Sequence, residues 1–360
     1  MTVTPLSTEI VSDPQRFAEL GEMWDALATR IGTPLARHAW FSAVLATLQQ
    51  HQFELSVVLV WDGAHLAAAA PLMIDKALSP ARLVPIDQFV GEPFRLLYRD
   101  QDALKALAHA CAGLRKPFLF RRLETSKTDL ALLSSALRSN AAVHCRPRHA
   151  SVAVQLPIDF ESFEASMSSS RRSTIRRKWR AAMQKHGQVL SEFITPELGN
   201  VPEQLARIRA IEGSGWKQRS GTALAADPRM DGFVSQLARA FAREGSLVLA
   251  YLTIGGRDAA CRLILRQQSA WFEIKIGFNE EFARFSPGVL LMHETLREAC
   301  RTGIGTYAFL GLREGWQDHW PHEATEDFRV ATYPFRPSGA FALADDCRQA
   351  VSSFSRRFFR

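Results

Sequence analysis

The chain has 360 residues, enough for two domains of ordinary size. Hydrophobic residues make up 47% and charged residues 22%, a globular composition that excludes a largely disordered chain. The 44 Lys and Arg exceed the 37 Asp and Glu, and the net charge of +7 suits an anionic ligand or surface without requiring one.

Targeting and metal signals are weak in this sequence. The N-terminal stretch MTVTPLSTEIVSDPQRF has neither a basic start nor an apolar core, so we expect no signal peptide. Apolar runs stay below the roughly 18 residues of a membrane span. The five cysteines are scattered and form no CxxC pair. These features favour a reduced, cytoplasmic protein without a cysteine metal site.

The first half of the chain predicts a mixture of helices and strands. Helical spacing of apolar residues predicts helices at 17–30, 38–50, 102–112 and 130–139. Runs rich in β-branched residues predict strands at 54–61, 66–74, 118–123 and 152–156. Asp62 and Gly63 suit a hairpin turn between the first two strands.

The second half predicts helices followed by a meander of strands. Helices are expected at 168–185, 201–217 and 229–243, and strands at 247–254, 259–266 and 270–278. A helix then opens with Ser286 as its cap, Pro287 in its first turn and Gly288. It ends at Gly303 and Gly305, and a short strand follows near 307–310.

The junction between strand 270–278 and this helix is of a type that binds anions. Free N–H groups and the positive end of the helix dipole both point at a ligand there. The alternative is that Pro287 and Gly288 serve the backbone turn alone.

A similar sequence pattern occurs in both halves. VVLVWDGAHLAAAAPLMI at 57–74 resembles LVLAYLTIGGRDAACRLIL at 247–265 in being a strand, a glycine turn and a strand that begins with small residues. We therefore predict an α/β (α+β) fold of two related halves, the first degenerate, each a mixed, mostly antiparallel sheet flanked by helices. The expected domains are 1–156 and 157–340, with a basic C-terminal helix or tail at 341–360.

Four segments carry a resemblance to a known family. They are RRSTIRRKWRAAMQKHG at 171–187, EGSGWK at 212–217, FSPG at 285–288 and the segment 311–320. Together with the order of helices, meander, helix and strand, they resemble the GNAT N-acyltransferases. Within these they resemble the CelD/BcsL (BioF2-like) acetyltransferases, which are related to the FemAB transferases with two GNAT-like halves. The usual pyrophosphate motif, Arg/Gln-x-x-Gly-x-Gly/Ala, is incomplete here.

The resemblance implies an N-acyltransferase. It implies transfer of an acetyl or longer acyl group, by direct attack, from CoA or an acyl carrier protein to a small-molecule or sugar amine. Backbone N–H groups of the central strand would polarise the thioester carbonyl, and the helix at Pro287 would receive the pyrophosphate. The donor, acetyl-CoA or another acyl-CoA, would contact Ile274, Ile276, Gly277, Arg284, Ser286, Gly288, Val289 and Leu290, and no metal is expected.

Three residues are candidates for catalysis. Glu273 lies in an apolar strand, where alternation puts it on one face with Lys275 and Gly277. It suits a general base, and the alternative is an exposed ion pair with Lys275. Lys217 suits contact with a phosphate or carboxylate, or it serves the dipole of a helix C-terminus. His293 suits proton transfer, or it is a packed histidine on an apolar helix face.

Substrate contacts are expected around the cleft. Trp216 suits the wall of an acyl pocket. The polar loop GLREGWQDHWPHEAT follows the last core strand, a position that commonly borders a cleft. His319, His322 and Asp318 in this loop lack the fixed spacing of metal ligands. The substrate-binding candidates are Trp216, Lys275, Trp316 and His319.

The helix at 168–185 is strongly basic. Ile175, Trp179 and Met183 form its apolar stripe, and six Lys and Arg flank it. It suits a nucleic acid, an anionic carrier or the phosphates of CoA, and the alternative is a solvated basic face. The tail FSRRFFR suits peripheral contact with a membrane surface, or a docked terminal helix.

Two other functions stay open on the sequence alone. One is a FemAB-like aminoacyl transferase that uses charged tRNA, for which the basic helix would contact the RNA. The other is a non-catalytic module of an exopolysaccharide or cell-envelope system that keeps the fold and lacks the donor site.

Overall fold

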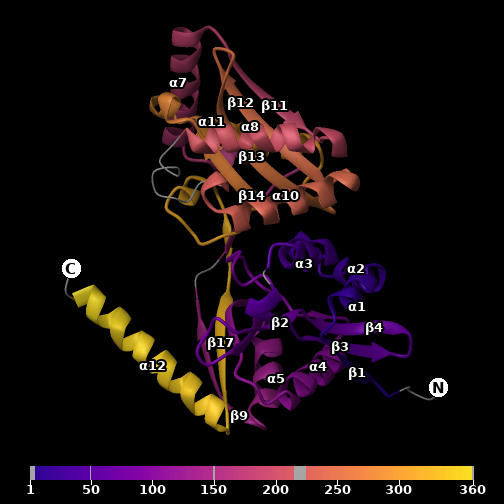
Figure 1. Ribbon diagram of the computed structural model, residues 1–360. Coiled ribbons are helices and arrows are strands. Elements are labelled where there is room, and N and C mark those ends of the chain that lie inside the picture. The colour runs from indigo at the N-terminus through magenta and orange to yellow at the C-terminus, as the bar shows by residue number, and fades with distance from the viewer. Residues whose placement is uncertain (1–4, 49, 149–150, 215–223, 359–360) are drawn as a thin grey trace. The chain divides into compact units, whose positions relative to one another are not determined.

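The computed structural model describes residues 5–48, 50–148, 151–214 and 224–358 (Figure 1). The chain divides into two compact units. The first combines Met1–His149 with Glu326–Arg360, and the second is Ala150–Thr325. The second unit is therefore inserted into the first. This division differs from the expected domains, because residues 326–340 belong to the first unit.

Helices flank mostly antiparallel sheets in each unit, so the predicted fold class is confirmed. The described part of the first unit has three sheets, with strand orders β1-β3-β4-β7, β2-β5-β6 and β8-β17-β9. Its strands are β1 (Ser7–Val11), β2 (Phe53–Leu55), β3 (Val57–Asp62), β4 (His65–Ala70), β5 (Leu72–Asp75), β6 (Arg82–Pro85), β7 (Leu97–Tyr98), β8 (Leu119–Glu124), β9 (Ala141–Pro147) and β17 (Asp327–Pro334). Its helices are α1 (Pro14–Glu19), α2 (Gly21–Ala28), α3 (His38–Leu45), α4 (Gln101–Gly113), α5 (Lys127–Leu137) and α12 (Pro337–Phe358).

Local signals explain the central elements of the first unit. Gly63 has a φ of 59°, and it makes the predicted turn between β3 and β4. Asp100 caps α4 by accepting a hydrogen bond from the Ala103 N–H at 2.9 Å, and Ser126 caps α5. The helix α4 packs against the apolar strands β3 and β4, and α5 packs against α4 and β9.

The helix α12 is held to the first unit by a buried arginine. Arg82 is 2% exposed, and its Nη2 donates to the Ala342 carbonyl at 2.9 Å and lies 2.9 Å from Asp346 Oδ1. Tyr333 Oη donates to Asp346 at 2.7 Å. Burial on its own raises the pKa of Asp346, but the hydrogen bonds from Arg82, Tyr333 and Arg329 outweigh it and lower the pKa to about 2.

The second unit is built on one sheet of seven described strands, in the order β11-β12-β13-β14-β15-β10-β16. The strands are β10 (Ser151–Gln155), β11 (Val189–Ile194), β12 (Leu247–Ile254), β13 (Arg257–Gln267), β14 (Ala270–Phe278), β15 (Thr306–Ala308) and β16 (Glu323–Thr325). The helices are α6 (Phe160–Ser166), α7 (Ser169–His186), α8 (Val201–Gly213), α10 (Pro228–Arg243) and α11 (Pro287–Arg301). No described helix in either unit is long and apolar enough to cross a membrane.

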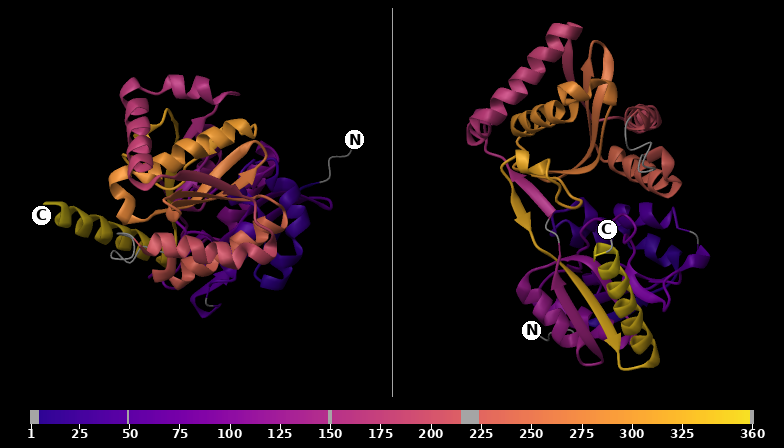
Figure 2. Two further views of the ribbon diagram at one scale, coloured as in Figure 1. Left: turned by 90° about the horizontal axis from the view of Figure 1, so that it is seen from above. Right: turned by 90° about the vertical axis from the view of Figure 1, so that its left-hand side faces the viewer.

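Helices cover both faces of this sheet. Figure 2 shows α7 and α11 on one face and α8 and α10 on the other. On the face covered by α7 and α11, the hydrophobic core contains Ile175 of α7, Leu290 of α11 and Ile264 of β13. The strands β12, β13 and β14 form the predicted antiparallel meander, and β14 then pairs with β15 in parallel.

The strand β14 is irregular in two ways. Leu263 of β13 pairs with Lys275, whereas the next residue, Ile264, pairs with Glu273, so Ile274 is an extra residue in β14. The expectation that Glu273 and Lys275 share a face is therefore wrong, because this bulge interrupts the alternation. Pairing with β15 also stops at Phe272. No described strand continues it along that edge of β14.

Candidate active site

The second unit contains a cavity of about 510 Å³ beside the end of β14. One wall is the part of β14 beyond its pairing with β15, and another is the first turn and a half of α11. The third is the loop between β15 and β16, which contributes Glu314, Trp316 and Trp320. Arg262 and Cys261 of β13, with Ala283 and Ser286 of the segment before α11, complete the lining. The cavity thus lies where the sheet stops being continuous.

Several predicted site residues meet in this lining. They are Ile276, Gly277, Ser286, Gly288, Val289 and Trp316. Leu290 instead lies in the core under α11. Trp216 and Lys217 lie outside the described residues. The cavity also has wall residues that the sequence analysis did not select, namely Phe278, Met292, Glu314 and Trp320.

The start of α11 differs from the prediction. Ser286 has φ 55° and ψ 56°, a left-handed conformation that residues other than glycine seldom adopt, and its side chain does not cap the helix. Pro287 has no N–H. The N–H groups of Val289 and Leu290 donate to the Ser286 carbonyl at 3.0 and 3.1 Å. The Gly288 N–H is left without a bonded partner among the described residues. The turn therefore offers fewer donors than a complete glycine-rich turn.

Gly288 leaves open space at the cavity. A Cβ atom placed there would meet nothing within 4 Å, so protein packing does not require this glycine. At Gly277 a Cβ atom would lie 2.7 Å from Glu212 Cγ and 3.1 Å from Cys261 Sγ. Gly277 is thus required by the close approach of α8, whereas Gly288 leaves room for a ligand.

A buried ion pair lies behind the cavity. Arg262 and Glu273 are 3% and 5% exposed, and their side chains are paired. Tyr307 Oη donates to the same Glu273 oxygen at 2.6 Å, and Arg262 Nη2 donates to the Gly288 carbonyl at 3.0 Å. Burial lowers the pKa of Arg262 and raises the pKa of Tyr307 to about 12. Glu273 therefore orients the guanidinium that contacts the first turn of α11.

This geometry bears on both interpretations of Glu273. Its burial does not fit an exposed pair with Lys275, which the bulge places on the opposite face of the sheet. A role as general base stays a prediction. It would require a carboxylate already held by Arg262 and Tyr307 to accept a further proton.

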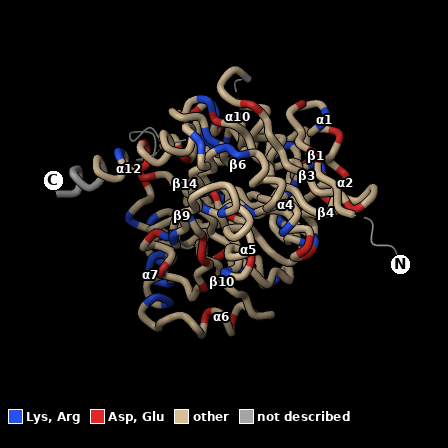
Figure 3. The backbone as a smooth tube through the Cα atoms, turned by 90° about the horizontal axis from the view of Figure 1, so that it is seen from below, with Lys and Arg blue, Asp and Glu red and all other residues tan. Residues whose placement is uncertain are grey.

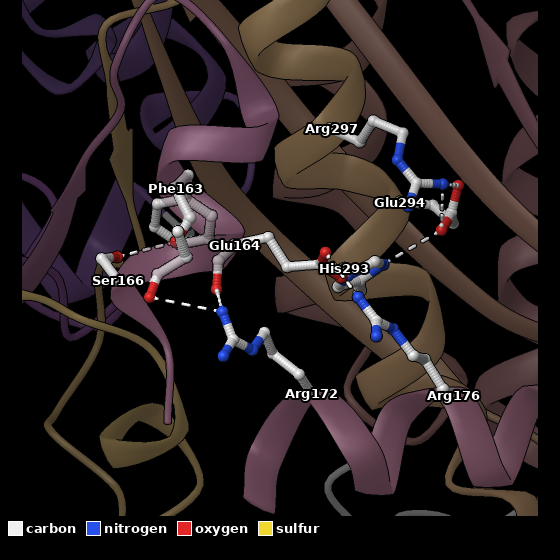
Figure 4. A network of polar contacts seen from close by, with 9 residues as sticks. Phe163, Glu164, Ser166, Arg172, Arg176, His293, Glu294 and Arg297 are labelled. Carbon is white, nitrogen blue, oxygen red and sulfur yellow. Dashed lines mark hydrogen bonds and ion pairs between the residues drawn. The ribbon is translucent and has the colours of Figure 1, made fainter. Parts of the chain in front are cut away.

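His293 belongs to a polar network between helices, shown in Figure 4. Its Nε2 lies 3.2 Å from Glu164 Oε1 and its Nδ1 lies 3.1 Å from Glu294 Oε1. Arg176 of α7 also pairs with Glu164 at 3.0 Å. Burial raises the pKa of Glu164, but hydrogen bonds from His293 and Arg176 lower it overall. This geometry fits the packed histidine that the sequence left as the alternative, and a catalytic role stays a prediction.

The loop between β15 and β16 is held by its own side chains. Arg313 Nη2 lies 2.7 Å from Asp318 Oδ1, and the hydrogen bond from Arg313 lowers the pKa of Asp318. Trp316 packs edge-on against Phe309 at a centroid distance of 5.3 Å. His319 is half-buried outside the cavity lining, and burial lowers its pKa. The described residues hold no cluster of His, Cys, Asp or Glu that could bind a metal ion.

The basic helix α7 runs beside this site. Figure 3 shows Lys and Arg along α7, and the helix has no Asp or Glu. Lys178 Nζ donates to the carbonyl of Arg284, which lies in the segment before α11. Arg177 is exposed and bonds to no described residue. Met183 of the predicted apolar stripe is 39% exposed, so the stripe is only partly buried.

The comparisons with known proteins bear on the fold. Residues 169–318, less than half of the chain, match the family model "Acetyltransferase (GNAT) domain". The chain is similar to a crystal structure of FemX, with a TM-score of 0.59 and 12% identity over 91% of this chain and 97% of that one. A search of curated proteins finds no match.

Two further solved structures are similar at the same level. The C-terminal domain (DUF2156) of a putative lysylphosphatidylglycerol synthetase from Agrobacterium fabrum has a TM-score of 0.53 and 11% identity, over 92% of this chain and 96% of that one. L-PGS from Bacillus licheniformis has a TM-score of 0.53 and 12% identity, over 89% and 91%. Such identities show the fold alone. The chain thus has a GNAT- and FemAB-like fold, and residues 169–318 match the model of a GNAT acetyltransferase domain. The resemblance to the CelD/BcsL family stays a prediction.

Proposed function

We propose that the second unit is an N-acyltransferase that moves an acyl group from acyl-CoA to an amine by direct attack. One observation carries the proposal: the edge of β14 that pairs with β15 has no further strand neighbour after Phe272 in the described part of the chain, and β14 borders the same cavity as the N-terminus of α11. An extended ligand arm has a strand edge to lie along, and an anion has a positive helix end beside it.

The cavity walls fit the parts of such a donor. Ile276, Phe278, Val289 and Met292 are apolar and suit the pantetheine arm and the acyl chain. The open space at Gly288, with its N–H and the positive end of α11, suits a phosphate. Backbone N–H groups within 274–278 would then stabilise the negative charge on the thioester oxygen during attack.

Acyl transfer to an amine needs little covalent help from a protein. It needs a positioned thioester, a neutral amine and a proton for the leaving thiolate. The proposal includes a longer acyl chain, and an acyl carrier protein as the alternative donor. The acceptor class, a small molecule or a sugar amine, is part of the proposal, as is a cytoplasmic location.

The experiment is a donor titration with a matched pair of variants. Acetyl-CoA and longer acyl-CoA should raise the melting temperature, because a ligand that binds the folded state stabilises it. Gly288→Asp adds a negative charge at the proposed phosphate site and should weaken donor binding at least about 100-fold. Gly199→Asp is the control, since a Cβ atom there also meets nothing within 4 Å and Gly199 is not part of the lining. Equal CoA affinity in the two folded variants would refute the donor site.

A second candidate is an aminoacyl transferase that uses charged tRNA. The observation that favours it is α7, an 18-residue helix with seven Lys and Arg and no acidic residue beside the cavity. RNA binding through such a surface would weaken steeply with salt. Binding of aminoacyl-tRNA, lost on Arg177→Glu but kept on Arg239→Glu of α10, would favour this candidate. A protein that binds neither acyl-CoA nor tRNA would be the non-catalytic module.

A further inference from the structure

The loop between β15 and β16 places a carboxylate on the cavity wall. Glu314 lines the cavity beside Trp316 and Trp320. Trp316 Nε1 donates to Glu314 Oε2 at 2.6 Å, and the Glu314 N–H donates to Gln317 Oε1 at 2.9 Å. These bonds hold a solvent-accessible carboxylate in one orientation.

Glu314 also has unused capacity to accept hydrogen bonds. A carboxylate can accept about four, and the tryptophan uses one. Its Oε1 bonds to no other described residue. Glu273, by contrast, is buried and already accepts from Arg262 and Tyr307. Within the described chain, Glu314 is the carboxylate of the cavity lining.

We infer that Glu314 binds the ammonium group of the acceptor and takes its proton, and that the acceptor is a primary amine on an apolar stem. The inference rests on the proposed function. A carboxylate is the natural partner of an ammonium ion, because the hydrogen bond between them joins two opposite charges. Trp316 and Trp320 of the same loop also line the cavity, and their indole rings suit an apolar stem rather than a sugar.

The step balances in atoms and charge. Glu314 accepts one proton from the ammonium and passes it to solvent, which its exposure allows. The free amine nitrogen then attacks the thioester carbon, so the N–C bond forms and the C–S bond breaks. The second nitrogen proton goes to the leaving sulfur. The products are an amide, a thiol and one released proton.

The first test measures binding and needs no turnover. n-Hexylammonium and the neutral n-hexanol are titrated into the full chain, followed by calorimetry. Glu314→Gln should weaken n-hexylammonium about tenfold or more, because a hydrogen bond to a charged group is lost, and should leave n-hexanol unchanged. Glu281→Gln is the control, since it removes the same charge from an exposed residue outside the lining. Equal affinity in wild type and Glu314→Gln, or no binding to wild type, overturns the inference.

The second test separates proton transfer from binding. With acyl-CoA and n-hexylamine, Glu314→Gln should lower kcat about 10²- to 10⁴-fold, leave the KM for acyl-CoA unchanged, and lose less rate as rising pH neutralises the amine. Unchanged kcat overturns the proton-accepting role. A wild type that releases no thiol from any acyl-CoA overturns the proposed function and the proton step together. The binding result then still confirms or overturns the ammonium site.

Discussion

Replacing Glu273 should destabilise the second unit severely. Glu273→Leu would leave the Arg262 guanidinium, 3% exposed, without its carboxylate. Removing one partner of a buried ion pair costs about 3–5 kcal/mol. Tyr307 would also lose its acceptor. The double variant Arg262→Met/Glu273→Leu removes both charges and should recover most of the loss, since apolar replacements of buried pairs are often neutral.

The assay for this pair is urea unfolding of wild type, both single variants and the double variant. The coupling between the two substitutions is the quantity of interest. If the free energy of unfolding of Glu273→Leu lay within about 1 kcal/mol of the wild-type value, the buried pair would not contribute as expected. A double variant no more stable than either single one would lead to the same conclusion.

The same residue allows a functional test of the base hypothesis. If Glu273 is the general base, Glu273→Gln should lose rate in proportion to the ionised fraction of the amine, and high pH should restore it. If Glu273 acts only by positioning Arg262, the loss should persist at high pH and should accompany weaker donor binding at the Gly288 turn.

Two further variants test packing and electrostatics. Gly277→Ala should destabilise the protein by about 1–3 kcal/mol because its Cβ atom would overlap Glu212, while Gly288→Ala, which meets nothing within 4 Å, should not; equal melting temperatures would contradict this. Asp346 has its folded pKa lowered from 3.8 to about 2, so it contributes stability above pH 4 that is lost as pH falls through about 2. The shift corresponds to about 2 kcal/mol. The free energy of unfolding should therefore fall less between pH 4 and 2 in Asp346→Asn than in wild type. The same dependence on pH in both proteins would contradict this role of Asp346.

Much of the second unit could be predicted from the sequence because its signals are local. The alternating strands of the meander, the glycine turn at 255–256 and the helical spacing after Pro287 each lie within one element. The bulge at Ile274 leaves no such signal. A bulge depends on how two strands pair, whereas the alternating pattern is read along one strand and assumes regular pairing. The sequence therefore predicted Glu273 and Lys275 on one face, whereas the bulge puts them on opposite faces.

The candidate site was predictable in outline only. The presence of Ile276 and Gly288 in the cavity lining follows from the strand and helix that carry them. Glu314 does not, because its place depends on how a loop folds over the cavity and on the bond from Trp316. The partner of Glu273 could not be predicted either. Arg262 lies on the neighbouring strand, and strand propensity does not show which residues of two strands lie opposite each other.

The insertion of the second unit has a consequence for synthesis on the ribosome. The strand β17 lies between β8 and β9, so their three-stranded sheet lacks its middle strand until translation has passed residue 334. The inserted unit is closed by its own ends, since Ser151 pairs with Thr325. We therefore expect the second unit to complete its fold before the first unit, although its residues begin later in the chain. A nascent chain stalled with β17 inside the exit tunnel should contain a protease-resistant second unit and an incompletely folded first unit.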